Sequence, residues 1–188
     1  MRILFASLLF GASIFASDFS IGSRVADIVV KDGEAPVVVS PAKSPATVVI
    51  FVSTRCPISN AYNQRMSAIY RDYQNKGVQF VYVNSNSNES QAEIQEHTNG
   101  NQLSYKVYKD AGNVLADQFG AQMTPEAYVF DRQGVLQYHG YVDDAKNESR
   151  VQVQGLRKAI DAVLAGRSPE LRDTKAFGCT IKRVRRAS

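Results

Sequence analysis

Two cysteines carry the strongest redox chemistry in this chain, and they lie far apart, at Cys56 and Cys179. Cys56 stands in VSTRCPIS, which follows the apolar run TVVIFV and precedes a segment with helical periodicity. A thiol at a helix N-terminus faces unpaired backbone N–H groups and the positive end of the helix dipole, which favour the nucleophilic thiolate. Arg55 adds to this effect if its guanidinium turns inward, and Pro57 is typical of a first helical turn. We therefore interpret Cys56 as a nucleophile; the alternative is a small buried side chain.

Alternating apolar strands and amphipathic helices are expected to position Cys56. TVVIFVST is typical of a strand buried on both faces, and residues 59–77 change to a helical period. The further expected strands are VQFVYVN, LSYKVYKD and the two halves of a hairpin about residues 131–134, and the further expected helices are ESQAEIQEHTNG, NVLADQFGA and VQVQGLRKAIDAVLAG. This β-α-β-α-β-α-β-β-α order predicts an α/β fold with Cys56 at the sheet edge where reaction sites lie. The NSNSNES loop leaves the same edge, so it is expected to cap the next helix and could line the site.

The two ends of the chain differ from its middle. Residues 1–17, MRILFASLLFGASIFAS, hold an apolar run that is short for a bilayer span of about 20 residues. They predict a signal peptide, hence an exported protein, periplasmic or secreted, without a stable membrane span after cleavage; an uncleaved anchor is the alternative. We expect a lead-in over 18–45, one domain over 46–166 and a basic tail over 167–188. The net charge of +4 originates in the terminal TIKRVRR, a solvated run that does not indicate a nucleic-acid partner.

Residues 46–165 resemble the thioredoxin superfamily, and within it the redoxin branch that includes alkyl hydroperoxide reductase, thiol-specific antioxidant and periplasmic thioredoxin-like proteins. FVSTRCPIS occupies the place of the active-site Cys-x-x-Cys, MTPEAYVFD supplies Thr124 and Pro125, and the DRQG hairpin with its following helix matches the end of the fold. The resemblance implies a thioredoxin-like fold, with a central mixed sheet flanked by helices on both faces and a C-terminal tail. It also implies a cis peptide at Pro125, facing the thiol, and an oxidoreductase that needs no cofactor.

The motifs also depart from that family. Ser59 replaces the second motif cysteine; its hydroxyl can donate a hydrogen bond to a Cys56 thiolate but cannot resolve a mixed disulfide. Ser53 keeps the hydroxyl that redoxin peroxidases place three residues before the thiol, whereas Val49 replaces their proline. Arg132, in a turn, is a poor match for their arginine. Thiol–disulfide exchange is therefore favoured over peroxide reduction.

Three interpretations of Cys179, in FGCTIKR, stay open. An even cysteine count in an exported chain favours pairing. Cys179 would then either resolve Cys56 in a redox cycle, reset by an external thiol reductant, or staple the tail to the domain permanently. In the third interpretation, Cys179 is buried and never paired.

Two other functions compete with the enzyme. One is a non-enzymatic thioredoxin-like binding module whose disulfide is structural. The other is copper delivery, with His139 in LQYHGYVDD near Asp143 and Asp144, but a single thiol with one imidazole would leave copper under-liganded, so we expect no metal. The expected partners of the enzyme are a protein disulfide or thiol, or a small peroxide, bound on the face shaped by Thr124 and Pro125.

Overall fold

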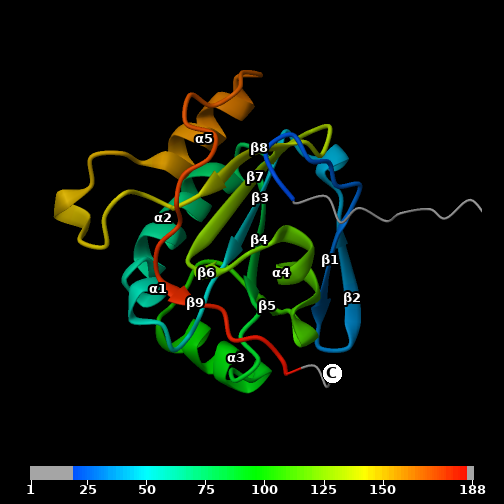
Figure 1. Cartoon of the computed structure of the whole chain (residues 1–188), viewed down its shortest axis with the longest axis vertical. Coiled ribbons are helices and arrows are strands. Elements are labelled where there is room, and N and C mark those ends of the chain that lie inside the picture. The colour runs from blue at the N-terminus through cyan, green and yellow to red at the C-terminus, as the bar shows by residue number, and fades with distance from the viewer. Residues whose placement is uncertain (1–18, 186–188) are drawn as a thin grey trace, which may run out of the picture.

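The computed structural model describes residues 19–185, which form one seven-stranded sheet with helices on both faces (Figure 1). The strand order is β2-β1-β5-β4-β3-β7-β8, and a separate two-stranded ladder joins β6 to β9. The predicted signal peptide lies outside the described residues. The strands are β1 (Ile28–Asp32), β2 (Ala35–Val39), β3 (Ala46–Phe51), β4 (Gln79–Asn84), β5 (Val107–Lys109), β6 (Met123–Thr124), β7 (Glu126–Asp131), β8 (Leu136–Gly140) and β9 (Cys179–Thr180).

Strand β3 lies in the interior of the sheet between β4 and β7, as its unbroken apolar sequence predicts. All six of its residues are buried. It pairs in parallel with β4 and antiparallel with β7, and β4 continues in parallel to β5. The sheet is therefore mixed, and the carboxyl ends of its three parallel strands meet at one edge, where the loops after Phe51, Asn84 and Lys109 come together.

Helices cover the two faces of the sheet unequally. The helices α2, α3 and α5 bury side chains in one core cluster with β3 and β4, and α4 buries its apolar side in the other. The helices are α1 (Pro57–Ala61), α2 (Asn63–Gln74), α3 (Gln91–Gly100), α4 (Val114–Phe119) and α5 (Gly155–Leu164), with short 3₁₀ turns at Pro41–Lys43, Ala111–Asn113 and Glu148–Arg150.

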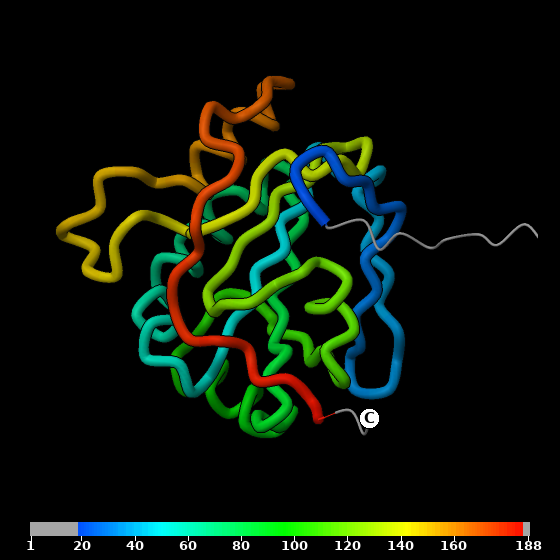
Figure 2. Tube along the Cα trace, in the orientation of Figure 1, coloured from blue at the N-terminus to red at the C-terminus, as the bar shows by residue number. Residues whose placement is uncertain are grey.

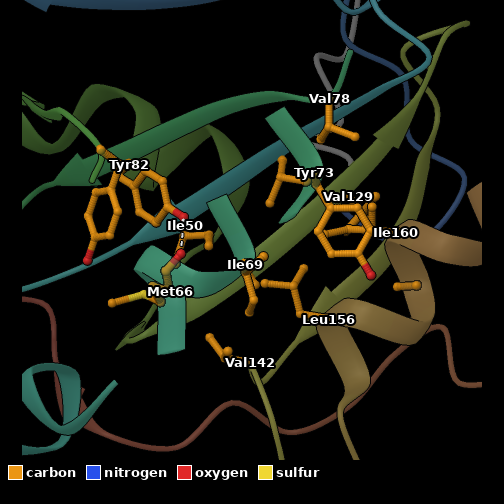
Figure 3. Close-up of a cluster of buried hydrophobic side chains, with 14 of the residues drawn as sticks. Ile50, Met66, Ile69, Tyr73, Val78, Tyr82, Val129, Val142, Leu156 and Ile160 are labelled. Atoms are coloured by element: carbon orange, nitrogen blue, oxygen red, sulfur yellow. Dashed lines mark hydrogen bonds between the residues drawn. The ribbon is translucent and has the colours of Figure 1, made fainter. Parts of the chain in front are cut away.

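The segment predicted as one helix after Cys56 forms two, α1 and α2, and the larger core cluster fixes α2. Met66 and Ile69 of α2 and Leu156 and Ile160 of α5 lie in one cluster with Ile50 of β3 (Figure 3). Burying such side chains contributes roughly 1.5–3 kcal/mol each. Helix α2, which follows the short α1 after Cys56, is therefore held against the sheet by its buried face.

Several predicted elements differ in extent. LSYKVYKD is a strand only over Val107–Lys109, because Tyr105 is buried in a loop and stacks on Tyr82 with 3.6 Å between ring centroids. The expected lead-in over 18–45 contains a regular hairpin, β1–β2, which extends the same sheet through a single register pair with β5. Within residues 19–185, no helix is long and apolar enough to cross a bilayer.

Residues 167–185 form an extended C-terminal strap across the domain. After α5 it descends along β8, where Asp173 makes a parallel bridge with His139, and then reaches β9 beside α1 and β6 (Figure 2). The strap carries Cys179 from the far end of α5 to the sheet edge that holds Cys56.

Candidate active site

Cys56 lies at the junction of β3 and α1, as its sequence position predicts. It is the N-cap residue of α1, with extended backbone angles, and Pro57 opens the helix. The backbone N–H of Ser59 donates a hydrogen bond to Sγ of Cys56 at 3.3 Å. The residue is only 2% exposed, so another part of the chain covers its sulfur.

Cys179 provides that cover and is bonded to Cys56 in a disulfide. The two Cα atoms are 5.8 Å apart although 123 positions separate the residues in sequence. This distance lies within the usual range for disulfides. Of the three interpretations of Cys179, the structure contains the paired form that the redox cycle and the permanent staple share.

Thr124 and Pro125 form the opposite wall of the site. Their peptide bond is cis, as the resemblance implies, and the carbonyl oxygen of Thr124 lies 3.4 Å from Sγ of Cys56. Thr124 is also the register partner of Cys179 in the β6–β9 ladder. The segment before Pro125 therefore contacts both sulfur-bearing residues.

Gly178 is required for this ladder. Its φ of +156° is rarely adopted by residues with a side chain, and an added Cβ would lie 2.0 Å from the carbonyl oxygen of Thr124. The Gly-Cys pair thus lets the strap approach the backbone of β6 closely enough for Cys179 to reach Cys56.

The other predicted site residues lie near Cys56 but direct their side chains elsewhere. The Arg55 guanidinium forms an ion pair with Glu93 at the surface and does not turn toward the sulfur. The Ser59 hydroxyl accepts a hydrogen bond from the backbone N–H of Ser53 at 3.1 Å, so Ser59 contacts Cys56 through its backbone instead. The Ser53 hydroxyl accepts from the Cys56 N–H at 3.0 Å.

Glu89 is a site residue that the sequence motifs did not reveal. It is 3% exposed, and its Oε1 accepts a 2.6 Å hydrogen bond from the Ser53 hydroxyl. Burial opposes ionisation, but hydrogen bonds from Ser53, Thr54 and Asn84 outweigh it and lower the pKa of the Glu89 carboxyl. The available signal was its place in NSNSNES, the loop considered as a possible lining of this edge. The loop caps the next helix as predicted, and the structure shows that it does so through a capping box of Ser90 and Glu93.

His139 lies in a different charge cluster from the one its sequence neighbours suggest. Its Nε2 lies 2.7 Å from Glu126 and its Nδ1 lies 2.9 Å from Asp173, whereas Asp143 pairs with the buried Arg65. Burial opposes protonation of His139, but the two carboxylates outweigh it and raise the pKa of the imidazole. No group of three or more metal-ligating His, Cys, Asp or Glu side chains occurs within residues 19–185.

Comparison with known proteins places these features in a family. Residues 21–139 match the AhpC/TSA family. No curated protein matches the chain. Similar solved structures include a hypothetical protein from Sinorhizobium meliloti, with 31% identity, a TM-score of 0.77 and coverage of 88% of this chain and 95% of that one. An uncharacterised conserved protein from Geobacillus kaustophilus has 27% identity, a TM-score of 0.81 and coverage of 90% and 95%.

A more distant likeness bears on the fold alone. The thioredoxin domain of a thiol-disulfide oxidoreductase from Bacteroides vulgatus has 16% identity and a TM-score of 0.53 over 62% of this chain and 85% of that one. Together with the mixed sheet and the helices on both faces, it confirms the predicted thioredoxin-like fold. The chain belongs to the AhpC/TSA family of thioredoxin-fold redoxins.

Proposed function

We propose that this protein is an exported thiol–disulfide oxidoreductase that cycles between a Cys56–Cys179 disulfide and a dithiol. The observation that carries the proposal is the disulfide itself, placed where β3 ends and α1 begins and facing the cis Thr124–Pro125 bond. A sulfur that receives a backbone N–H from a first helical turn is stabilised as a thiolate, which makes it both a good nucleophile and a good leaving group.

The proposed reaction balances over two exchange steps. In the reduced protein, the Cys56 thiolate attacks one sulfur of a substrate disulfide and releases the other as a thiolate. The Cys179 thiolate then attacks Sγ of Cys56, releasing the second substrate thiolate and forming the intramolecular disulfide. An external thiol reductant restores the dithiol and becomes a disulfide itself.

Disulfide exchange is favoured over peroxide reduction by the orientation of two side chains. A peroxidase benefits from donors aimed at the developing charge on the peroxide oxygens. Here the Ser53 hydroxyl donates to Glu89, and the Arg55 guanidinium pairs with Glu93. Neither group is directed at Sγ of Cys56, so a hydroperoxide is the second candidate substrate.

The reduction potential of the pair tests the proposal against a structural bridge. A potential near −200 mV supports a cycling pair, whereas a value below about −300 mV supports a permanent staple in a binding module. A second measurement is alkylation of the reduced protein, in which Cys56 is expected to react rapidly near pH 6. Cys56→Ser should abolish this fast phase and Cys179→Ser should retain it. A reduced protein that reacts only after denaturation contradicts the proposal.

Export is tested separately, because residues 1–17 lie outside the described structure. The signal-like pattern of this segment supports cleavage near residue 16 or 17. The mass of the protein recovered from the producing cell's exterior or periplasm should correspond to the shortened chain. Recovery of the full-length chain in the cytosol would refute export without affecting the proposed chemistry.

A further inference from the structure

We infer that the buried carboxylate of Glu89 is a positioning residue for both cysteines, since one hydrogen-bonded network connects it to the loop before Cys56 and to the strap after Cys179. The inference rests on the proposed function only in calling the pair redox-active. The contacts that carry it involve neither the disulfide nor the cis peptide.

The first arm runs from Glu89 to Cys56 through Ser53. The Ser53 hydroxyl has one hydrogen, which it donates to Oε1 of Glu89 at 2.6 Å. Its oxygen then accepts from the backbone N–H groups of Cys56 at 3.0 Å and Arg55 at 3.2 Å. Glu89 therefore sets the direction of a hydroxyl that fixes the backbone of the nucleophile.

The second arm runs from Glu89 to the strap through two asparagines. Oε2 of Glu89 accepts a 2.6 Å hydrogen bond from Nδ2 of Asn84, whose Oδ1 accepts from the backbone N–H of Asn86 at 3.0 Å. Oδ1 of Asn86 in turn accepts from the backbone N–H of Lys182 at 2.9 Å. The neighbouring Ser87 N–H donates to the Lys182 carbonyl at 2.8 Å, so the strap is bound here as a short extended segment.

The network requires an acceptor at Glu89. Its two oxygens take hydrogen bonds from the Ser53 hydroxyl, the Asn84 amide, and both the backbone N–H and the hydroxyl of Thr54. An ionised carboxylate has only acceptor sites and satisfies all of these donors, and hydrogen bonds to a charged group are the stronger kind. In Glu89→Gln, the NH₂ group of the amide would face one of these donors and could not accept its hydrogen bond.

The strap keeps its place by contacts that do not involve sulfur. Ile181 is 2% exposed in the second core cluster, and its N–H donates to the Gln122 carbonyl at 2.8 Å. The N–H of Val184 donates to Oδ1 of Asn113 at 2.7 Å. Cys179 is thus held beside Cys56 in the dithiol as well, and the precision of that placement determines the effective molarity of the pair.

The test is the effective molarity of Cys179 toward Cys56, measured as the equilibrium constant for disulfide formation in dithiothreitol redox buffers. Glu89→Gln is expected to lower it about 10- to 100-fold, from the cost of one unpaired buried donor. A tenfold fall corresponds to about 30 mV toward a more oxidising potential. Glu96 is exposed on α3, so Glu96→Gln makes the same carboxylate-to-amide change at the surface; this matched control should stay within twofold of the wild type. An equal constant for wild type and Glu89→Gln overturns the inference.

Asn86→Ala tests the second arm and serves if Glu89→Gln fails to fold. It should lower the effective molarity at least fivefold, since it removes the acceptor of the Lys182 N–H. In the double variant Glu89→Gln, Asn86→Ala, the loss should not exceed that of Glu89→Gln alone by more than threefold, because contacts in one network are not additive. Fully additive losses would mean two independent supports and would overturn the single network. A wild-type potential as low as that of a permanent structural disulfide would refute the proposed function, yet these ratios between variants would still decide the role of Glu89.

Discussion

Gly178→Ala is the substitution for which the structure predicts the sharpest effect on the cysteine pair. The added Cβ would lie 2.0 Å from the carbonyl oxygen and 2.7 Å from the carbonyl carbon of Thr124. Both are backbone atoms of β6 and cannot swing aside as a flexible side chain could. Either the strap moves away from β6, carrying Cys179 from Cys56, or residue 178 leaves its native conformation.

The magnitude follows from the cost of the conformation alone. A residue with a side chain held at a φ such as the +156° of Gly178 costs of order 1–3 kcal/mol. That range corresponds to a factor of about 5 to 150 in an equilibrium constant. The effective molarity of Cys179 toward Cys56 should fall by at least this factor, because the close contact adds to the conformational cost.

The assay is the disulfide equilibrium in a dithiothreitol buffer, with reduced and oxidised forms separated by alkylation and mass. Gly166→Ala is the matched control, since Gly166 has a φ of +68° but no atom within 4 Å of an added Cβ. It should lower the unfolding free energy while leaving the disulfide equilibrium within twofold of the wild type. The reasoning is refuted if Gly178→Ala also stays within twofold, or if both variants lose the same factor.

Three further outcomes are expected. Cys179→Ser should lower the unfolding free energy by roughly 2–5 kcal/mol in denaturant titration, because the native disulfide closes a loop across 123 positions. A change below about 1 kcal/mol would mean that the disulfide does not constrain the unfolded chain. Asp143→Ala should cost about 3–5 kcal/mol by the same method, since it leaves the charge of the buried Arg65 unpaired, and a near-neutral result would contradict the burial of the pair. Burial of His139 opposes protonation, but Glu126 outweighs it and raises the pKa of the folded imidazole. The protonated imidazole therefore stabilises the fold fully below its ordinary pKa near 6.5, and this stabilisation is lost as pH rises through the folded pKa. The difference in urea midpoint between wild type and His139→Gln should therefore shrink toward alkaline pH, and a constant difference would exclude this linkage.

Much of the fold follows from patterns between near neighbours. The β-branched run before Cys56, the change to a helical period after Pro57 and the capping box at Ser90 each depend on residues within a few positions of one another. They predict the central strand, the helix start and the edge at which the site lies. Tyr105 departs from these patterns, because its alternating neighbours predict a strand whereas a stacked pair with Tyr82 buries it in a loop.

The side chains around the sulfur were less predictable. The sequence placed Ser53, Arg55 and Ser59 near Cys56, but which way a polar side chain turns depends on partners from other elements. Arg55 meets Glu93 and Ser53 meets Glu89, both supplied by the segment that follows β4. Nothing in the neighbouring sequence distinguishes a solvated carboxylate in a polar loop from one that is buried as a hydrogen-bond acceptor.

Sequence patterns alone predict that a thiol stands where a buried strand gives way to a helix, and the resemblance assigns Thr124 and Pro125 to the same fold. The bond between Cys179 and Cys56, across 123 positions, emerged from the tertiary structure alone, because a two-residue strand has no periodicity and its register with β6, 55 positions earlier in the chain, is set by packing. The same holds for Glu89, whose position between the Cys56 loop and the strap exists only once separate segments meet at one sheet edge. Local patterns set elements, whereas the convergence of distant polar groups depends on how those elements pack.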